Sequence, residues 1–139
     1  MTTSIAPNRF GAAEVRACSR HLATVVAIRG DVSAADLDAV AARVRQFVLP
    51  DTAFVLDLSE LHSIPSDGVS LLTGVDDAAA EADVEWALVA GPATAALFDA
   101  TIRDRMLPLV DSVADALHDF VDARATQRTL LLPLLQRSA

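Results

Sequence analysis

The side chains best suited to chemistry gather in one polar segment, residues 57–68. Ser66 and His62, with Asp57 or Asp67, have the residue types of a nucleophile, a base and an orienting acid. The Gly-x-Ser-x-Gly elbow that exposes a hydrolase nucleophile is absent, and proximity in sequence does not create base-to-nucleophile geometry. Asp67 also lacks the lysine that receiver-type phosphoacceptor domains use, because every basic residue of the chain is arginine. We therefore expect no enzymatic activity.

The rest of the chain offers no recognisable metal or cofactor site. His21, His62 and His118 lie far apart, without the spacing of metal ligands. The absence of lysine removes the phosphate-binding lysine of a P-loop and any Schiff-base lysine. Cys18 is the single cysteine, so it cannot form an internal disulfide, and we interpret it as a small packing residue. We expect neither a metal nor a cofactor.

Charge and hydropathy exclude two classes of partner. The net charge of −8 argues against nucleic acid, whose binding needs positive charge to displace counterions. No apolar run approaches the ~20 residues of a membrane span, and residues 1–9 lack the regions of a signal peptide. The sequence therefore predicts one soluble, cytoplasmic domain that binds neither nucleic acid nor membrane.

Apolar periodicity predicts alternating strands and helices. Residues 14–20 and 22–28 have β-rich patterns and should form a hairpin around residues 19–21. Ser33 with Asp36, and Ser112 with Asp115, have the spacing of capping boxes that open helices. Further strands are expected over 52–58, 84–90 and 107–110, and further helices over 66–82 and 93–101. This order predicts an α/β fold with a mixed, mostly parallel sheet, an N-terminal hairpin and about four helices.

The two ends of the chain differ in composition from the predicted domain of residues 12–122. Residues 1–11 are expected to form a flexible arm. Residues 123–139 form a leucine-rich extension that contains Thr129-Leu-Leu-Leu-Pro-Leu-Leu135, which should not remain in water. Two interpretations stay open for this extension: it packs back on the domain, or it contacts a partner, including a second copy in a homodimer.

The segment from the strand over 52–58 to the helix over 66–82 should lie at the carboxyl end of the sheet, where function usually sits. The unpaired amide groups and the dipole at a helix start favour negative charge. A phosphoserine there would be tolerated by its own helix while it presents about −1.5 to −2 charge to a partner. Ser66 and Asp67 stand at this start.

This strand and loop, Leu56-Asp-Leu-Ser59 followed by Pro65-Ser-Asp-Gly68, resemble the switch segment of the STAS domain family. The resemblance extends over about residues 12–122. Within the family, the chain is most similar in pattern to the bacterial anti-sigma factor antagonists. Family members carry Asp-Ser-Ser-Gly or Asp-Ser-Thr-Gly there, and the second hydroxyl is phosphorylated. The unphosphorylated form binds an anti-sigma kinase, and phosphorylation releases it. Here Asp67 occupies the position of that hydroxyl.

Other departures from the family pattern affect the same switch. Ser33 replaces the second acid of the Gly-Glu-Leu-Asp-like turn, although Asp31 keeps the first, and Pro65 replaces the acid before the hydroxyl pair. Ser66 and Ser63 remain as hydroxyls for phosphorylation at a shifted position. Asp67 has two interpretations, either a residue that only caps its helix or a permanent charge that partly mimics the phosphorylated state.

The resemblance implies a non-catalytic signalling module that binds an anti-sigma factor or serine kinase-type protein. Its switch would be Ser66 and Asp67, with Ile64 and Val69 as exposed apolar contacts. Two alternatives are a small-molecule sensor with a deep apolar pocket and an oligomeric scaffold assembled through the extension. The expected partner-binding residues are Asp31, Ser33, Ser63, Ile64, Pro65, Gly68 and Val69.

Overall fold

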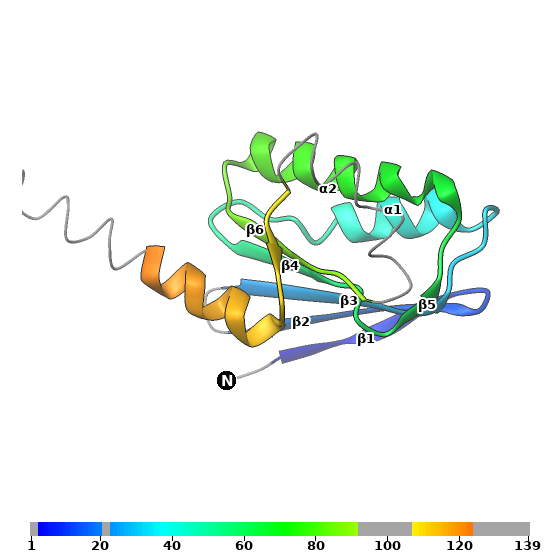
Figure 1. Cartoon of the computed structure of the whole chain (residues 1–139), viewed down its shortest axis with the longest axis horizontal. Helices are drawn as coiled ribbons and strands as arrows, with labels where there is room; N and C mark the ends of the chain where they lie inside the picture. The colour runs from blue at the N-terminus through cyan, green and yellow to red at the C-terminus, as the bar shows by residue number, and fades with distance from the viewer. Residues whose placement is uncertain (1–2, 21–22, 92–106, 124–139) are drawn as a thin grey trace, which may run out of the picture.

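A computed structural model describes residues 3–20, 23–91 and 107–123. The chain forms one mixed sheet with helices on both faces (Figure 1). The strands are β1 (Thr3–Phe10), β2 (Ala13–Arg20), β3 (Ala23–Asp31), β4 (Ala53–Asp57), β5 (Leu61–Ser63), β6 (Trp86–Val89) and β7 (Leu109–Val110). The helices are α1 (Leu37–Arg45), the short 3₁₀-helix η1 (Ser66–Gly68) and α2 (Val69–Ala82), followed by a helical segment over residues 113–123.

The sheet confirms the predicted fold class. Its strand order is β1-β2-β3-β4-β6-β7, and β5 pairs with the end of β3, beyond the part of β3 that pairs with β4. The first three strands are antiparallel, and β4, β5, β6 and β7 are each parallel to the neighbour they join. Three α-helices lie in the described residues, whereas about four were expected, and the helix expected over 93–101 falls outside those residues.

The N-terminal arm is the clearest correction. Residues 1–11 were expected to be flexible, but Thr3–Phe10 forms strand β1, which pairs with β2 along its length. Phe10 packs against the main core, and the Arg43 Nε on α1 donates to the Asn8 side-chain oxygen at 2.8 Å. The alternation in this segment is broken by Pro7 and a register shift between Ile5 and Asn8, which hides its strand character in the sequence.

Gly30 allows β3 to continue beside the turn that joins β1 and β2. Its φ of +85° lies in the region that side chains disfavour. A Cβ there would lie only 2.3 Å from the backbone oxygen of Ala12. Glycine is therefore required at this position, just before the Asp31–Ser33 turn.

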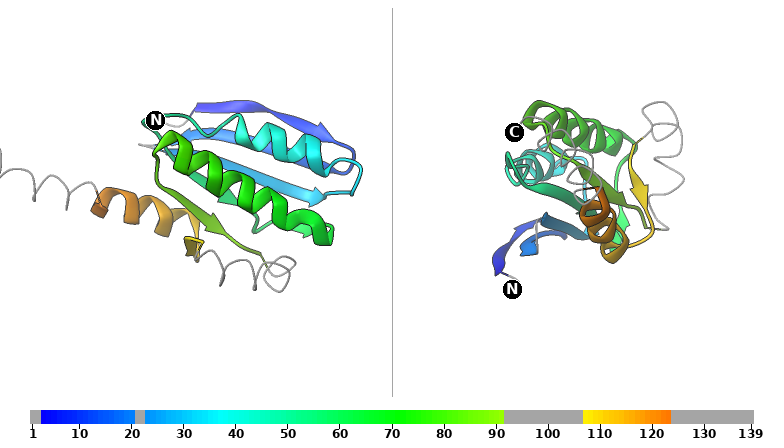
Figure 2. Two further views of the ribbon diagram at one scale, coloured as in Figure 1. Left: turned by 90° about the horizontal axis from the view of Figure 1, so that it is seen from above. Right: turned by 90° about the vertical axis from the view of Figure 1, so that its left-hand side faces the viewer.

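The core has two parts, one on each face of the sheet. Helices α1 and α2 cover one face, and residues 113–123 lie against the other (Figures 1 and 2). The larger cluster includes Phe54, Leu56, Leu72 and Leu88, all fully buried. The smaller cluster joins Val55 and Val89 to Phe120. Strand β4 is thus covered on both faces, as its nearly continuous apolar sequence predicts.

The two predicted capping boxes form only in their serine half: each hydroxyl accepts an amide, but α1 begins after Asp36 without a side-chain cap. The Asp36 amide donates to Ser33 Oγ at 3.2 Å, and the Asp115 amide donates to Ser112 Oγ at 3.1 Å. The α1 helix begins only at Leu37, because residues 34–36 form a turn. The hairpin between β2 and β3 is also as predicted, with Arg20 opposite Ala23 and the turn residues outside the described part of the chain.

Candidate functional site

The candidate site begins where β4 ends at the carboxyl edge of the sheet. Asp57 closes this strand, and its Oδ1 accepts a hydrogen bond from the Ser59 amide at 3.0 Å. Leu58 is fully buried behind it. Asp57 therefore shapes the turn out of β4, which is a structural role.

Strand β5 then places two distant segments side by side. It pairs with the end of β3, and the Val32 amide donates to the Ser63 carbonyl at 2.9 Å. The Ser63 hydroxyl donates to Asp31 Oδ1 at 2.6 Å, across 32 positions of sequence. Both side chains are exposed. This hydrogen bond joins the Asp31–Ser33 turn to the loop that leads into α2.

The helix start that follows is built in two steps. Pro65 precedes η1 with an extended ψ of 161°, and the Gly68 amide donates to the Pro65 carbonyl at 2.8 Å. Helix α2 continues from Val69 to Ala82. The helix expected over 66–82 is therefore present, with its first turn in the tighter 3₁₀ form.

Ser66 and Asp67 are both exposed within η1. Neither the start of η1 nor the start of α2 has a side-chain capping hydrogen bond. Asp67 lies in the first turn of η1, where the helix dipole favours its negative charge, and its carboxylate makes no capping hydrogen bond within the described residues.

The apolar residues of the loop are less available than expected. Ile64 and Val69 are half-buried and pack against the main core. Gly68 is buried, and a Cβ there would lie 2.7 Å from both the Cδ1 and Cγ1 atoms of Ile64. The expectation of exposed apolar contacts is therefore wrong in part, because these side chains pack against the core and hold the loop in place.

The remaining predicted residues take separate roles. Ser33 is exposed, and its hydroxyl donates to Asp36 Oδ2 at 3.0 Å, so this serine serves the start of α1. His62 is exposed on β5, and no hydrogen bond joins it to Ser66 within the described residues. Those residues contain no cluster of side chains that could hold a metal ion and no helix able to cross a membrane.

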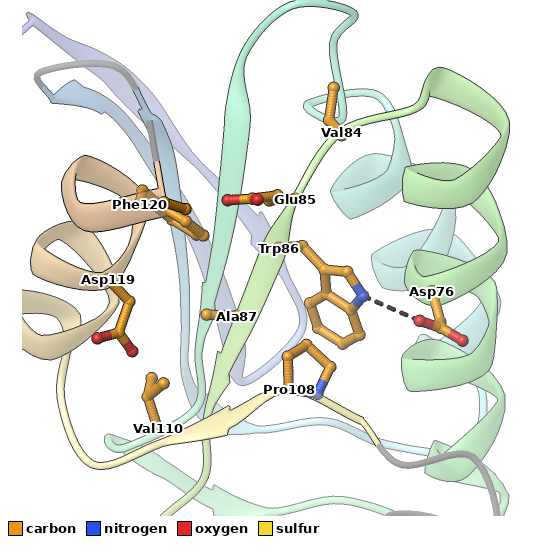
Figure 3. A pocket seen from close by; sticks show the side chains of 10 residues that line it. Asp76, Val84, Glu85, Trp86, Ala87, Pro108, Val110, Asp119 and Phe120 are labelled. Atoms are coloured by element: carbon orange, nitrogen blue, oxygen red, sulfur yellow. Dashed lines mark hydrogen bonds between the residues drawn. The ribbon is translucent and has the colours of Figure 1, made fainter. Parts of the chain in front are cut away.

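A second feature, which the sequence analysis missed, is an open groove of about 470 Å³ at the start of β6 (Figure 3). Trp86 lies on the α2 side of the strand, where its Nε1 donates to Asp76 Oδ1 at 3.0 Å. Phe120 lies on the other side, on the helical segment 113–123. The sequence signal was the single tryptophan of a chain poor in aromatic residues. We call this feature the Trp86 groove; its lining residues are Asp76, Val84, Glu85, Trp86, Ala87, Pro108, Val110, Asp119, Phe120 and Ala123.

Comparison with known proteins places this fold and loop in context. The model of the family described as STAS domain matches residues 14–116. Osmosensory protein A of Mycobacterium tuberculosis is 44% identical over 134 residues, which cover 94% of this chain and 85% of that protein.

Two solved structures share the fold. An anti-sigma factor antagonist from Mycobacterium paratuberculosis superposes with a TM-score of 0.58 at 22% identity, over 86% of this chain and 93% of that one. The unphosphorylated anti-sigma factor antagonist SpoIIAA superposes with a TM-score of 0.61 at 13% identity, over 78% of this chain and 96% of that one. At these identities the likeness is one of fold.

Proposed function

The chain belongs to the STAS domain family, and we propose that it is a non-catalytic signalling module that binds an anti-sigma factor or serine kinase-type protein. The observation that carries the proposal is the exposed carboxylate of Asp67 at the start of α2, without a capping hydrogen bond. This negative charge suits the dipole at the helix start, and because the side chain is exposed it is also available to a partner. The fold of two anti-sigma factor antagonists supports the same class.

The binding surface consists of the loop over residues 63–69 and the Asp31–Ser33 turn. The Ser63–Asp31 hydrogen bond holds these two segments together, so they meet a partner as one surface. Ile64 and Val69 fix the loop on the core and contribute only their exposed edges. Recognition on this surface is therefore mainly polar, and charge complementarity decides which partner binds.

Asp67 holds the module in a state that partly resembles the phosphorylated one. A single carboxylate carries one negative charge, whereas a phosphoserine carries about −1.5 to −2 and three strong acceptor oxygens. The mimicry is incomplete, and affinity for the partner is lowered without being abolished. Ser66 and Ser63 are exposed hydroxyls beside this charge and remain sites for phosphorylation at a shifted position.

The test compares wild type with Asp67→Ser and Asp67→Asn against the host's anti-sigma kinases, by calorimetry with nucleotide present. Removing the charge should raise affinity for one partner by about tenfold, equivalent to about 1.4 kcal/mol. Asp119→Ser is the matched control, because Asp119 is an exposed carboxylate on the opposite face of the sheet. If neither variant gains affinity, or the control gains as much, the proposed role of Asp67 is wrong.

The mycobacterial relative is named an osmosensory protein, which suggests the signal to which this module responds. We assign osmotic stress as the condition that changes the partner's availability. Complex formation in cells, followed by two-hybrid signal before and after a rise in sucrose or salt, should then change for wild type. A signal that responds to heat or oxidant but not to osmolarity contradicts this assignment.

The small-molecule alternative expects a deep apolar pocket. The Trp86 groove is open to solvent and lies at the start of β6, whereas the switch loop follows the carboxyl end of β4. A ligand in this groove would not touch Asp67 or its loop. The protein-binding function therefore has the stronger support.

A further inference from the structure

We propose that the Trp86 groove binds the leucine-rich segment of the same chain, residues 129–135. This inference goes beyond signalling at the switch loop and does not depend on it. It assigns an occupant to a surface that is apolar at its floor and acidic at its rim.

Trp86, Pro108, Val110 and Phe120 line the groove from three different elements (Figure 3), with Trp86 and Phe120 each 7% exposed. The opening exists because pairing of β6 with β7 starts only at Leu88, opposite Leu109, which leaves the first part of β6 without β7 beside it. Leu109 and Val121 are exposed at 49% and 44% on the elements that supply Val110 and Phe120, but neither lines the groove.

The rim of the groove is acidic. Glu85 and Asp119 are exposed, and within the described residues neither forms an ion pair. Figure 3 shows them on the same side of β6 as Phe120. Asp76 adds a third carboxylate, which accepts the Trp86 hydrogen bond on the other side. An occupant should therefore combine apolar side chains with positive charge.

Residues 124–139 have this composition. They contain five leucines and no acidic residue, in a chain whose net charge is −8. Their positive charges flank the leucines, at Arg124, Arg128 and Arg137. Charge complementarity thus selects this segment from within the protein itself.

Connectivity makes the interaction intramolecular. Ala123 lines the groove, so the chain leaves directly from its wall. Five residues, 124–128, separate Ala123 from Thr129, which matches the short connections that reverse a chain in compact domains. A segment tethered at this distance has a high effective concentration for its site, about millimolar or more, so modest contacts suffice to hold it.

Cross-linking tests the contact and its topology in the full-length chain. In a Cys18→Ser background, Asp119→Cys and Leu132→Cys should be joined within one molecule by a short bismaleimide, as seen by mass spectrometry of the monomer. Asp38→Cys with Leu132→Cys is the matched control, because Asp38 is exposed on α1, away from the groove. A cross-linked dimer, or no cross-link at all, overturns the proposal, as does equal cross-linking of the control.

Discussion

Gly68→Ala tests whether the loop over residues 63–69 is anchored by tight packing. Gly68 has helical backbone angles, with φ of −59° and ψ of −17°, so alanine fits the backbone. The new Cβ would lie 2.7 Å from the Cδ1 and Cγ1 atoms of half-buried Ile64, which must then move. Gly74 in α2 is the matched position, since its Cβ would meet only the flexible Arg45 side chain, at 3.2 Å.

The two substitutions should change stability in opposite directions. Replacing a helical glycine by alanine stabilises by about 0.5–1 kcal/mol, and Gly74→Ala should show this gain. Overpacking a filled site costs about 1–3 kcal/mol, so Gly68→Ala should lose about 1–2 kcal/mol net. The gap between the two variants is then about 1.5–3 kcal/mol.

Urea unfolding followed by circular dichroism measures this gap, with the slope checked for constancy so that midpoints report stability. Ile64→Ala provides the second arm, because it removes both atoms that the new Cβ meets. Ile64→Ala should cost less in the Gly68→Ala background than in wild type. If Gly68→Ala is as stable as Gly74→Ala, or if the cost of Ile64→Ala is the same in both backgrounds, the packing argument fails.

Three further predictions concern single contacts. Gly30→Ala should destabilise by about 2 kcal/mol or more, because its φ is +85° and its Cβ would meet the Ala12 oxygen; thermal unfolding checks this, and a wild-type midpoint contradicts it. Trp86→Phe should cost about 1.5–3 kcal/mol by removing the hydrogen bond to Asp76. A double-mutant cycle with Asp76→Ala measures that bond, and strict additivity would show that it contributes nothing. Ser63→Ala should cost less than about 1 kcal/mol, since its bond to Asp31 is exposed and the backbone bond to Val32 remains; a larger loss in chemical denaturation refutes the view of this contact as a local link.

Local sequence patterns determined much of the fold. The apolar run of β4 marks a strand covered on both faces, and its burial follows from that pattern. Ser33 and Ser112 mark helix starts because their hydroxyls accept nearby amides, an interaction complete within four residues. The position of Asp67 at the start of a helix was readable in the same way. These features involve neighbours in sequence, which a single chain displays directly.

Tertiary structure alone decided the contacts that shape the site. Ser63 meets Asp31 only because β5 adds to the end of β3, and β5 is too short for periodicity to reveal. The chain enters α2 through Pro65 and a 3₁₀ turn, and this backbone geometry sets the exposed position of Asp67.

Contacts between residues on different strands and helices cannot be predicted from local sequence patterns either. Strand β1 is held by its hydrogen bonds to β2, and the irregular sequence of β1 does not predict this pairing. Trp86, Asp76 and Phe120 share one groove although they come from three elements. Sequence therefore identified most of the segments of the fold. The sheet determined which side chains meet, since contacts between distant residues arise only when strands and helices pack.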